Sequence, residues 1–181
     1  AAAIQRVVDR HETLRTVFAE QDGRPVQIIH PRLTLEIPFI DLSQFPSEQS
    51  DVMVDQLLGS QTVKPFSLTD GPLFRATIVV QNDQRHALLL TMHHIISDGW
   101  SFNVFIGELT AFYAALSAGI EPPLPSMDIQ FADYAVWETK VLQQEISEVQ
   151  LPYWRNQLAD LPGHTELPVD FPWPSRPSTR G

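Results

Sequence analysis

Apolar residues recur at helical spacing in several stretches of this chain, and these stretches predict its helices. The first stretch has a single apolar face, made by Ile4, Val7, Val8, His11, Leu14 and Phe18. This 3.6-residue period is typical of a helix that packs one side against a core. The expected helices span about residues 1–15, 47–59, 101–117 and 129–160, the last bent or interrupted near Pro152.

Shorter apolar or alternating runs between these helices predict strands. Asp22-Gly23 is a turn signal between two β-type runs and predicts a hairpin. Pro38 offers no N–H to a ladder, so its run belongs at a sheet edge or a bulge. The expected strands are 16–20, 26–29, 35–40, 73–81 and 85–92, with the last two forming the clearest hairpin.

The composition narrows the classes of protein to which this chain can belong. Its 181 residues favour one lobe or domain, and the net charge of −10 disfavours nucleic acid and anionic membranes as partners. The absence of cysteine excludes a thiol nucleophile, a disulfide framework and a cysteine-based zinc site. Apolar runs are too short to span a bilayer, and no secretory signal is recognisable at the start. A cytoplasmic location inside a longer chain is therefore expected.

The most chemically informative stretch follows the apolar run Ala87-Leu88-Leu89-Leu90. His93 and His94 come at the predicted strand end, Asp98 follows in a turn, and Gly99 leads toward a helix. This order places a reactive imidazole on a rigid scaffold. Since adjacent strand residues point to opposite faces, His93 and His94 are poorly placed to bind one metal ion.

Three motifs carry a resemblance to a known family. Residues 93–99 resemble the His-His-x-x-x-Asp-Gly signature of nonribosomal peptide synthetase condensation domains, which belong to the superfamily of chloramphenicol acetyltransferase. Residues 10–18 are similar to the family's Arg-His-Glu-x-Leu-Arg-Thr-x-Phe motif. Residues 131–137 resemble Tyr-x-Asp-[Tyr/Phe]-Ala-x-Trp, with Phe131 in place of the usual tyrosine.

The resemblance implies a fold and a domain organisation. The fold class is α/β, an α+β two-layer sandwich like the N-terminal lobe of chloramphenicol acetyltransferase, with helices packed on a mixed sheet. Residues 1–160 correspond to this lobe, truncated at its start. The Pro-rich residues 161–181 correspond to the crossover toward a C-terminal lobe that this sequence lacks.

The resemblance also implies roles for individual residues. His94 is the catalytic histidine that faces the cleft, whereas His93 faces the core. Asp98 is structural and pairs with a motif arginine, either Arg15 or Arg10. Near the thioester, the backbone of Gly99 is placed to approach the substrate. No metal is expected.

The implied reaction is amide formation between two carrier-bound substrates. The amine of an acceptor aminoacyl thioester attacks the thioester of a donor aminoacyl or peptidyl group, with an L-configured donor and an L-configured acceptor as the expected subtype. His94 accepts the amine proton, or positions the amine and stabilises charge.

The implied partners are donor and acceptor carrier proteins and an adjacent adenylation domain. Substrates arrive on phosphopantetheine arms, and no cofactor is bound directly. The isolated fragment is expected to be incomplete and inactive. Two alternatives stay open: a non-catalytic lobe that docks carriers, and a stand-alone O-acyltransferase that uses a soluble acyl thioester.

Overall fold

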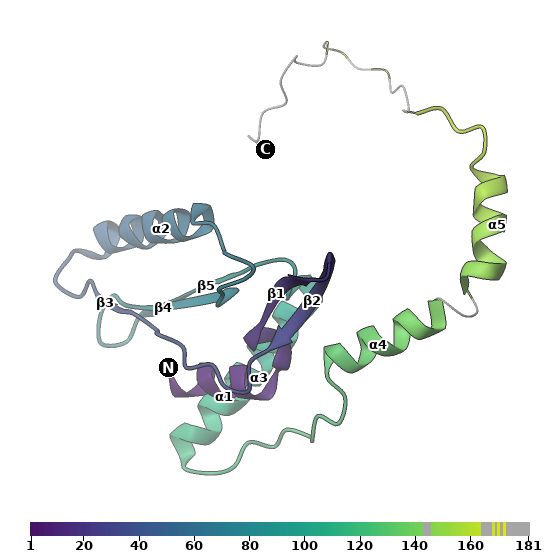
Figure 1. Cartoon of the computed structure of the whole chain (residues 1–181). Helices are drawn as coiled ribbons and strands as arrows, with labels where there is room; N and C mark the ends of the chain where they lie inside the picture. The colour runs from purple at the N-terminus through teal and green to yellow at the C-terminus, as the bar shows by residue number, and fades with distance from the viewer. Residues whose placement is uncertain (143–145, 164–167, 169, 171, 173–181) are drawn as a thin grey trace. The chain divides into compact units, whose positions relative to one another are not determined.

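The computed structural model describes residues 1–142, 146–163, 168, 170 and 172 (Figure 1). The chain divides into two compact units, Ala1–Val136 and Trp137–Gly181. The first unit contains the three-stranded sheet and the helices around it, and it carries both histidines of the central motif.

A mixed three-stranded sheet forms the centre of the first unit. Its strands are β3 (Phe39–Asp41), β4 (Phe74–Val80) and β5 (His86–Met92), in the order β3-β4-β5. β3 runs parallel to β4, and β4 runs antiparallel to β5. The predicted mixed sheet and its central hairpin are therefore confirmed. β3 begins only after Pro38, whose carbonyl accepts the N–H of Ile78.

A separate hairpin joins β1 (Thr16–Gln21) to β2 (Arg24–Ile29). Asp22 and Gly23 both have positive φ angles, of 52° and 74°. Two successive left-handed residues match the twist of a two-residue β-turn, which is why an Asp-Gly pair suits this position. The sequence-based prediction of this hairpin is confirmed.

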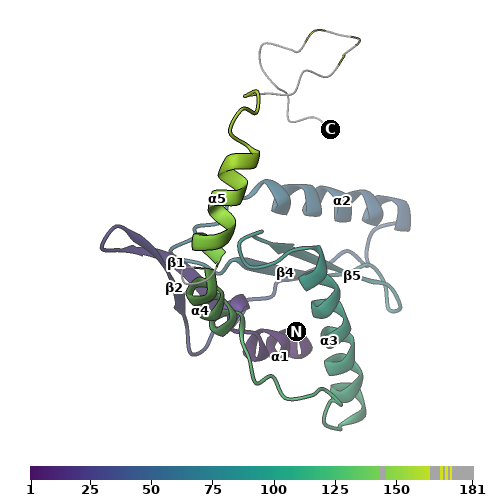
Figure 2. The same ribbon diagram turned by 90° about the vertical axis from the view of Figure 1, so that its right-hand side faces the viewer.

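Helices cover both faces of the sheet (Figures 1 and 2). α2 (Ser47–Val63) lies on one face, over a buried cluster of Leu42, Val79 and Leu89. α1 (Ala2–Arg10) and α3 (Gly99–Ala118) lie on the other face and contribute to the larger core. That core includes Ile4, Val7, Val8, Leu14, Leu73, Phe74, Ile96, Phe105 and Phe112.

The opening helix is shorter than the apolar pattern predicts. His11 is extended, with φ −101° and ψ 110°, and ends α1. A 3₁₀ turn, η1 (Glu12–Arg15), follows and still buries Leu14. The apolar spacing thus identified four buried side chains, at Ile4, Val7, Val8 and Leu14, with His11 and Phe18 only half-buried, and it extended the α-helix too far.

α3 has well-defined ends that the sequence suggested only in part. Its N-cap is Asp98, and the helix begins at Gly99, two residues earlier than predicted. Gly119 has a left-handed φ of 67° and donates its N–H to the carbonyls of Ala115 and Leu116. This confirms Gly119 as the residue that terminates the helix.

The structure describes two helices within the expected long one, on either side of residues 143–145, which lie outside the described residues. α4 (Phe131–Val141) begins in the first unit, and α5 (Ser147–Gln157) belongs to the second. The region is not interrupted at Pro152, because Pro152 lies inside α5, and a bend there stays a prediction. α5 is exposed along its length, so water can bond the carbonyl that Pro152 leaves without a donor.

The compact first unit ends at Val136, earlier than the predicted lobe boundary at 160. That boundary stays a prediction. Most of the predicted crossover, 161–181, lies outside the described residues.

Candidate active site

The motif histidines lie where β5 ends. His93 donates its N–H to the carbonyl of Leu73, which continues the ladder by one residue beyond Met92. Along a strand, side chains alternate between faces, so Met92 and His94 share one side and His93 takes the other. His93 is half-buried and His94 is exposed.

A cavity of about 520 Å³ opens on the side of His94. His94 lies in its wall together with the residues of the motif loop up to Ser101 and the first turns of α3. Further wall residues come from η1 and from the start of α4. The lining includes His11, Leu14, Met92, His94, Trp100 and Phe131. Apolar side chains make up most of the exposed wall, and His94 is one of the polar groups set among them.

The side chain of His93 is used within the loop. Its Nδ1 accepts the N–H of Ile95 at 3.1 Å, and its carbonyl accepts the N–H of Ile96 at 3.1 Å. Its ring meets the ring of Phe66 edge to face, with centroids 6.0 Å apart and planes at 88°. His93 therefore shapes the turn that carries His94.

Asp98 caps α3 through a reciprocal arrangement with Ser101. Its Oδ1 accepts the N–H of Ser101 at 2.8 Å and the Ser101 hydroxyl at 2.6 Å. The same hydroxyl accepts the N–H of Asp98 at 3.3 Å. The Ser101 hydroxyl and, next, its backbone N–H lower the pKa of Asp98, because both bonds favour the carboxylate.

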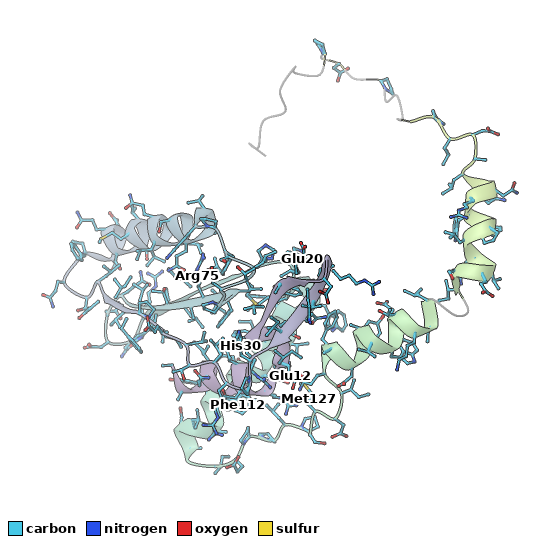
Figure 3. The ribbon with its side chains drawn as sticks, viewed as in Figure 1. Glu12, Glu20, His30, Arg75, Phe112 and Met127 are labelled. Carbon is cyan, nitrogen blue, oxygen red and sulfur yellow. The ribbon has the colours of Figure 1, made fainter. Side chains whose placement is uncertain are left out.

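The structure corrects the predicted ion pair between Asp98 and an arginine. Arg15 donates to the carbonyl of His30 and lies 3.4 Å from the carboxylate of Glu12; Figure 3 labels both His30 and Glu12. Arg10 lies 3.1 Å from the carboxylate of Glu108. Across the residues that the structure describes, neither arginine pairs with Asp98. The reason is that Asp98 is exposed and bonded to Ser101, whereas Arg15 pairs with Glu12 within η1 and Arg10 pairs with Glu108 of α3.

Gly99 is the first residue of α3, and its backbone is accessible. No atom outside its immediate neighbours lies within 4 Å of the place where a Cβ would stand. Its φ is not in the left-handed region. The space beside Gly99 therefore suits close approach by a ligand, and the glycine is not required for a special backbone conformation.

His11 and Glu108 are site residues that the sequence reasoning missed. His11 Nε2 lies 2.6 Å from Glu108 Oε2, and the Glu108 side chain is only 13% exposed. Glu108 is the single charged residue of α3. A lone carboxylate on an otherwise uncharged helix was the available signal, since it needs a partner when buried.

Gln130 ties the start of α4 to the segment after α1. Its Oε1 accepts the N–H of Glu12 at 3.1 Å, and its Nε2 donates to the carbonyl of Arg10 at 3.0 Å. Arg10 adds a bond of 2.7 Å to the carbonyl of Pro125. These bonds hold the neighbouring Phe131 where it closes one wall of the cavity.

Within the described ranges, no group of three or more His, Cys, Asp or Glu residues is arranged to hold a metal ion. Over the same ranges, none of the helices has the length and apolar character needed to cross a membrane.

Comparison with known proteins defines the family. The model of the condensation domain matches residues 1–181. A linear gramicidin synthase of Brevibacillus parabrevis is 42% identical over 173 residues, which cover 96% of this chain and 2% of the synthase. Chondramide synthase of Chondromyces crocatus is 38% identical over 185 residues, covering 100% of this chain and 5% of that protein. The chain belongs to the condensation-domain family.

Solved structures agree with this assignment. The X-domain of teicoplanin biosynthesis, in a complex with OxyB, has a TM-score of 0.81 and 31% identity. That match covers 97% of this chain and 38% of the X-domain chain. The starter condensation domain of rhizomide synthetase has the same fold, with a TM-score of 0.79 at 20% identity. The chain spans well under half of each solved chain and has the architecture of the family's N-terminal lobe, which confirms the predicted fold.

Proposed function

We propose that this chain is the histidine-bearing lobe of a domain that forms peptide bonds in nonribosomal peptide synthesis. The observation that carries the proposal is the exposed His94 in the wall of an apolar cavity, on a loop fixed by His93 and Asp98. Relatives of this chain include a nonribosomal cyclodepsipeptide synthetase that is 42% identical to it, which supports the same reaction class.

In the proposed reaction, the acceptor amine attacks the donor thioester carbonyl. A carbon–nitrogen bond forms, the carbon–sulfur bond breaks, and the donor carrier leaves as a thiol after receiving a proton. His94 accepts the proton of the amine or holds the amine in line. An α-amino group titrates near ~7.7–8, so part of it is already neutral at pH 7, and positioning and charge stabilisation contribute more than proton abstraction.

The other polar groups of the loop support this role. Asp98 fixes the start of α3, and the accessible backbone of Gly99 offers an N–H near the reacting carbonyl. The substrates are carried on phosphopantetheine arms of donor and acceptor carrier proteins. An adenylation domain of the same synthetase supplies the aminoacyl group. The lobe itself binds no cofactor.

The expected subtype joins an L-configured donor to an L-configured acceptor. His93 occupies the first position of the motif. In heterocyclisation domains, which have a similar motif, that position is an aspartate. Residues 98–101 and 131–137 also resemble ordinary condensation sequences. Loaded carriers with D- and L-donors distinguish the subtypes in one assay.

The test is single-turnover transfer between two loaded carriers by the full synthetase. His94→Ala should lower amide formation by roughly 10²–10⁴-fold with nearly unchanged melting temperature, because His94 is exposed and its loss removes a positioning or acid–base group. His86→Ala, at the exposed start of the same strand, is the matched control and should transfer at the normal rate. Normal transfer by His94→Ala would refute the assignment.

A docking function is the second candidate, and one observation favours it. The X-domain that resembles this chain was solved in a complex with another protein, OxyB. A domain of this fold can therefore bind another protein. If the wild-type synthetase fails to join loaded carriers, yet its condensation region retains a carrier or enzyme partner in a pull-down, docking replaces catalysis as the function.

A further inference from the structure

We propose that Arg75 and Phe66 are positioning residues for His94, which act through the ring of His93. The inference rests on the proposed function for its effect on rate, but the contacts that carry it are independent of that function. These contacts link Arg75 on β4 to Phe66 in the loop after α2, and Phe66 to His93 at the end of β5.

Arg75 fixes the loop 64–66 by three contacts. Its guanidinium carbon lies 3.7 Å from the centroid of the Phe66 ring. The same group donates to the carbonyls of Lys64, at 2.8 Å, and Pro65. A planar guanidinium can stack on a ring and donate sideways at the same time, which an ammonium group cannot do. Arg75, which is labelled in Figure 3, therefore sets both the place and the tilt of Phe66.

Strand register brings this group to the motif. Arg75 lies opposite Thr91 in the ladder of β4 and β5, so the two side chains share a face. His93 is two residues after Thr91 and points to that same face by alternation. The edge-to-face contact between Phe66 and His93 is the result. Aromatic pairs of this geometry contribute beyond simple burial of area.

The ring of His93 transmits this placement to His94. Its Nδ1 accepts the Ile95 N–H, so the ring must present a lone pair toward the backbone that follows His94. A ring free to rotate would lose this bond, and the loop would carry His94 in several orientations. Phe66 restricts the rotation, which is how a residue outside the cavity holds the catalytic histidine.

The experiment measures the complete synthetase in single turnover. Phe66→Ala and Arg75→Lys should each lower the transfer rate by about three- to tenfold, with unchanged KM for the carriers. Phe66→Tyr keeps the ring and should restore the rate. Should Phe66→Ala fold poorly, Phe66→Leu keeps most of the bulk without a ring edge. A Phe66→Leu rate equal to that of wild type would overturn the proposal.

Leu57→Ala is the control for loss of stability alone. Leu57 packs against the separate cluster of Leu42, Val79 and Leu89, which contains no residue of the motif. The proposal predicts that Leu57→Ala lowers the melting temperature but keeps the rate per folded molecule. An equal fall in rate for Leu57→Ala and Phe66→Ala would mean that stability explains both, and the proposal would fail.

A second readout separates this inference from the proposed function. The ring ¹⁵N shifts of His93, measured by NMR, should show an unprotonated Nδ1 in wild type and in Phe66→Tyr. In Phe66→Ala, the ring should sample orientations with and without the bond to Ile95, and the ¹⁵N shifts should become an average over these orientations. The same change should be seen in a His94→Ala background, which has no activity. Unchanged His93 shifts in Phe66→Ala would overturn the inference, whether or not the synthetase forms amide bonds.

Discussion

The two sides of the β5 end differ in how completely their polar groups are used. On the side of His93, the ring is bonded to Ile95, packed against Phe66 and backed by Arg75. On the side of His94, the imidazole faces an open cavity with a largely apolar wall. The alternation of a single strand separates a fixed histidine from an available one. Two adjacent histidines thus differ in their contacts: the ring of His93 is held by its neighbours, and the ring of His94 faces the cavity.

The largest expected effect concerns the core beneath the cavity side. Phe74 is fully buried, shares a face with Met92 and contacts Phe105, with ring centroids 5.4 Å apart. Phe74→Ala should lower the free energy of unfolding by about 3–5 kcal/mol, because it removes apolar contacts and leaves a cavity. Chemical denaturation of the domain measures this loss.

The comparison becomes sharper with a deletion on the opposite face. Leu89→Ala empties part of the cluster under α2 and should cost about 2–5 kcal/mol. It should leave the transfer rate per folded molecule unchanged, whereas Phe74→Ala should lower it. Equal rates for the two variants would show that the cavity wall does not depend on the core below it.

The second prediction concerns the carboxylate shared by Arg10 and His11. Glu108→Gln weakens both interactions of a side chain that is only 13% exposed. It should lower the free energy of unfolding by about 1.5–3 kcal/mol, the range for hydrogen bonds to charged groups. The exposed pair of Arg85 and Asp51 is the control, since Arg85→Gln should change the free energy of unfolding by less than about 1 kcal/mol. Equal losses in thermal denaturation would contradict the structural role of Glu108.

The third prediction tests His93 as an acceptor within the loop. His93→Ala leaves the Ile95 N–H without its partner and should cost about 1–3 kcal/mol of stability. His93→Asn should recover part of this, since an asparagine side chain can accept the N–H two residues later. Activity per folded molecule should fall far less in either variant than in His94→Ala. A folded His93→Asn protein with the His94→Ala defect would reverse the two assignments.

The smallest effect is expected at Asp98. Asp98→Ala should lower the melting temperature slightly at pH 7, through loss of the cap, because no buried ion pair is broken. Since the pKa of Asp98 is lowered in the folded state, the stabilisation is present above the unfolded pKa of about 3.9 and is lost as pH falls through the folded value. The difference between wild type and Asp98→Ala should therefore shrink below about pH 4. A constant difference in a melting series from pH 7 to pH 3 would contradict the role as a charged cap.

Local patterns predicted much of the fold and of the motif geometry. The Asp22-Gly23 turn and the opposed directions of His93 and His94 depend only on backbone preferences and alternation, which sequence shows directly. The left-handed Gly119 is a further case. Each involves residues close together in the chain.

Contacts between distant segments were the part that sequence could not give. The sequence alone does not show which carboxylate pairs with Arg10 or with Arg15. Only the packing of α1 against α3 shows that Glu108 is the partner of Arg10. The Phe66–His93 contact likewise depends on where the loop after α2 returns to the sheet. Pro152 misled for another reason: an exposed helix tolerates the bond that proline removes.

The bonds of Gln130 have a consequence for anyone who recombines synthetases. They join the side chain of Gln130 to the backbone of Glu12, 118 positions earlier in the sequence, and to the backbone of Arg10, 120 positions earlier. A chimera whose junction falls between these segments takes the two partners from different parents, and the wall at Phe131 then depends on whether they still match. Junctions placed beyond Val136, where the first compact unit ends, inherit the pair intact.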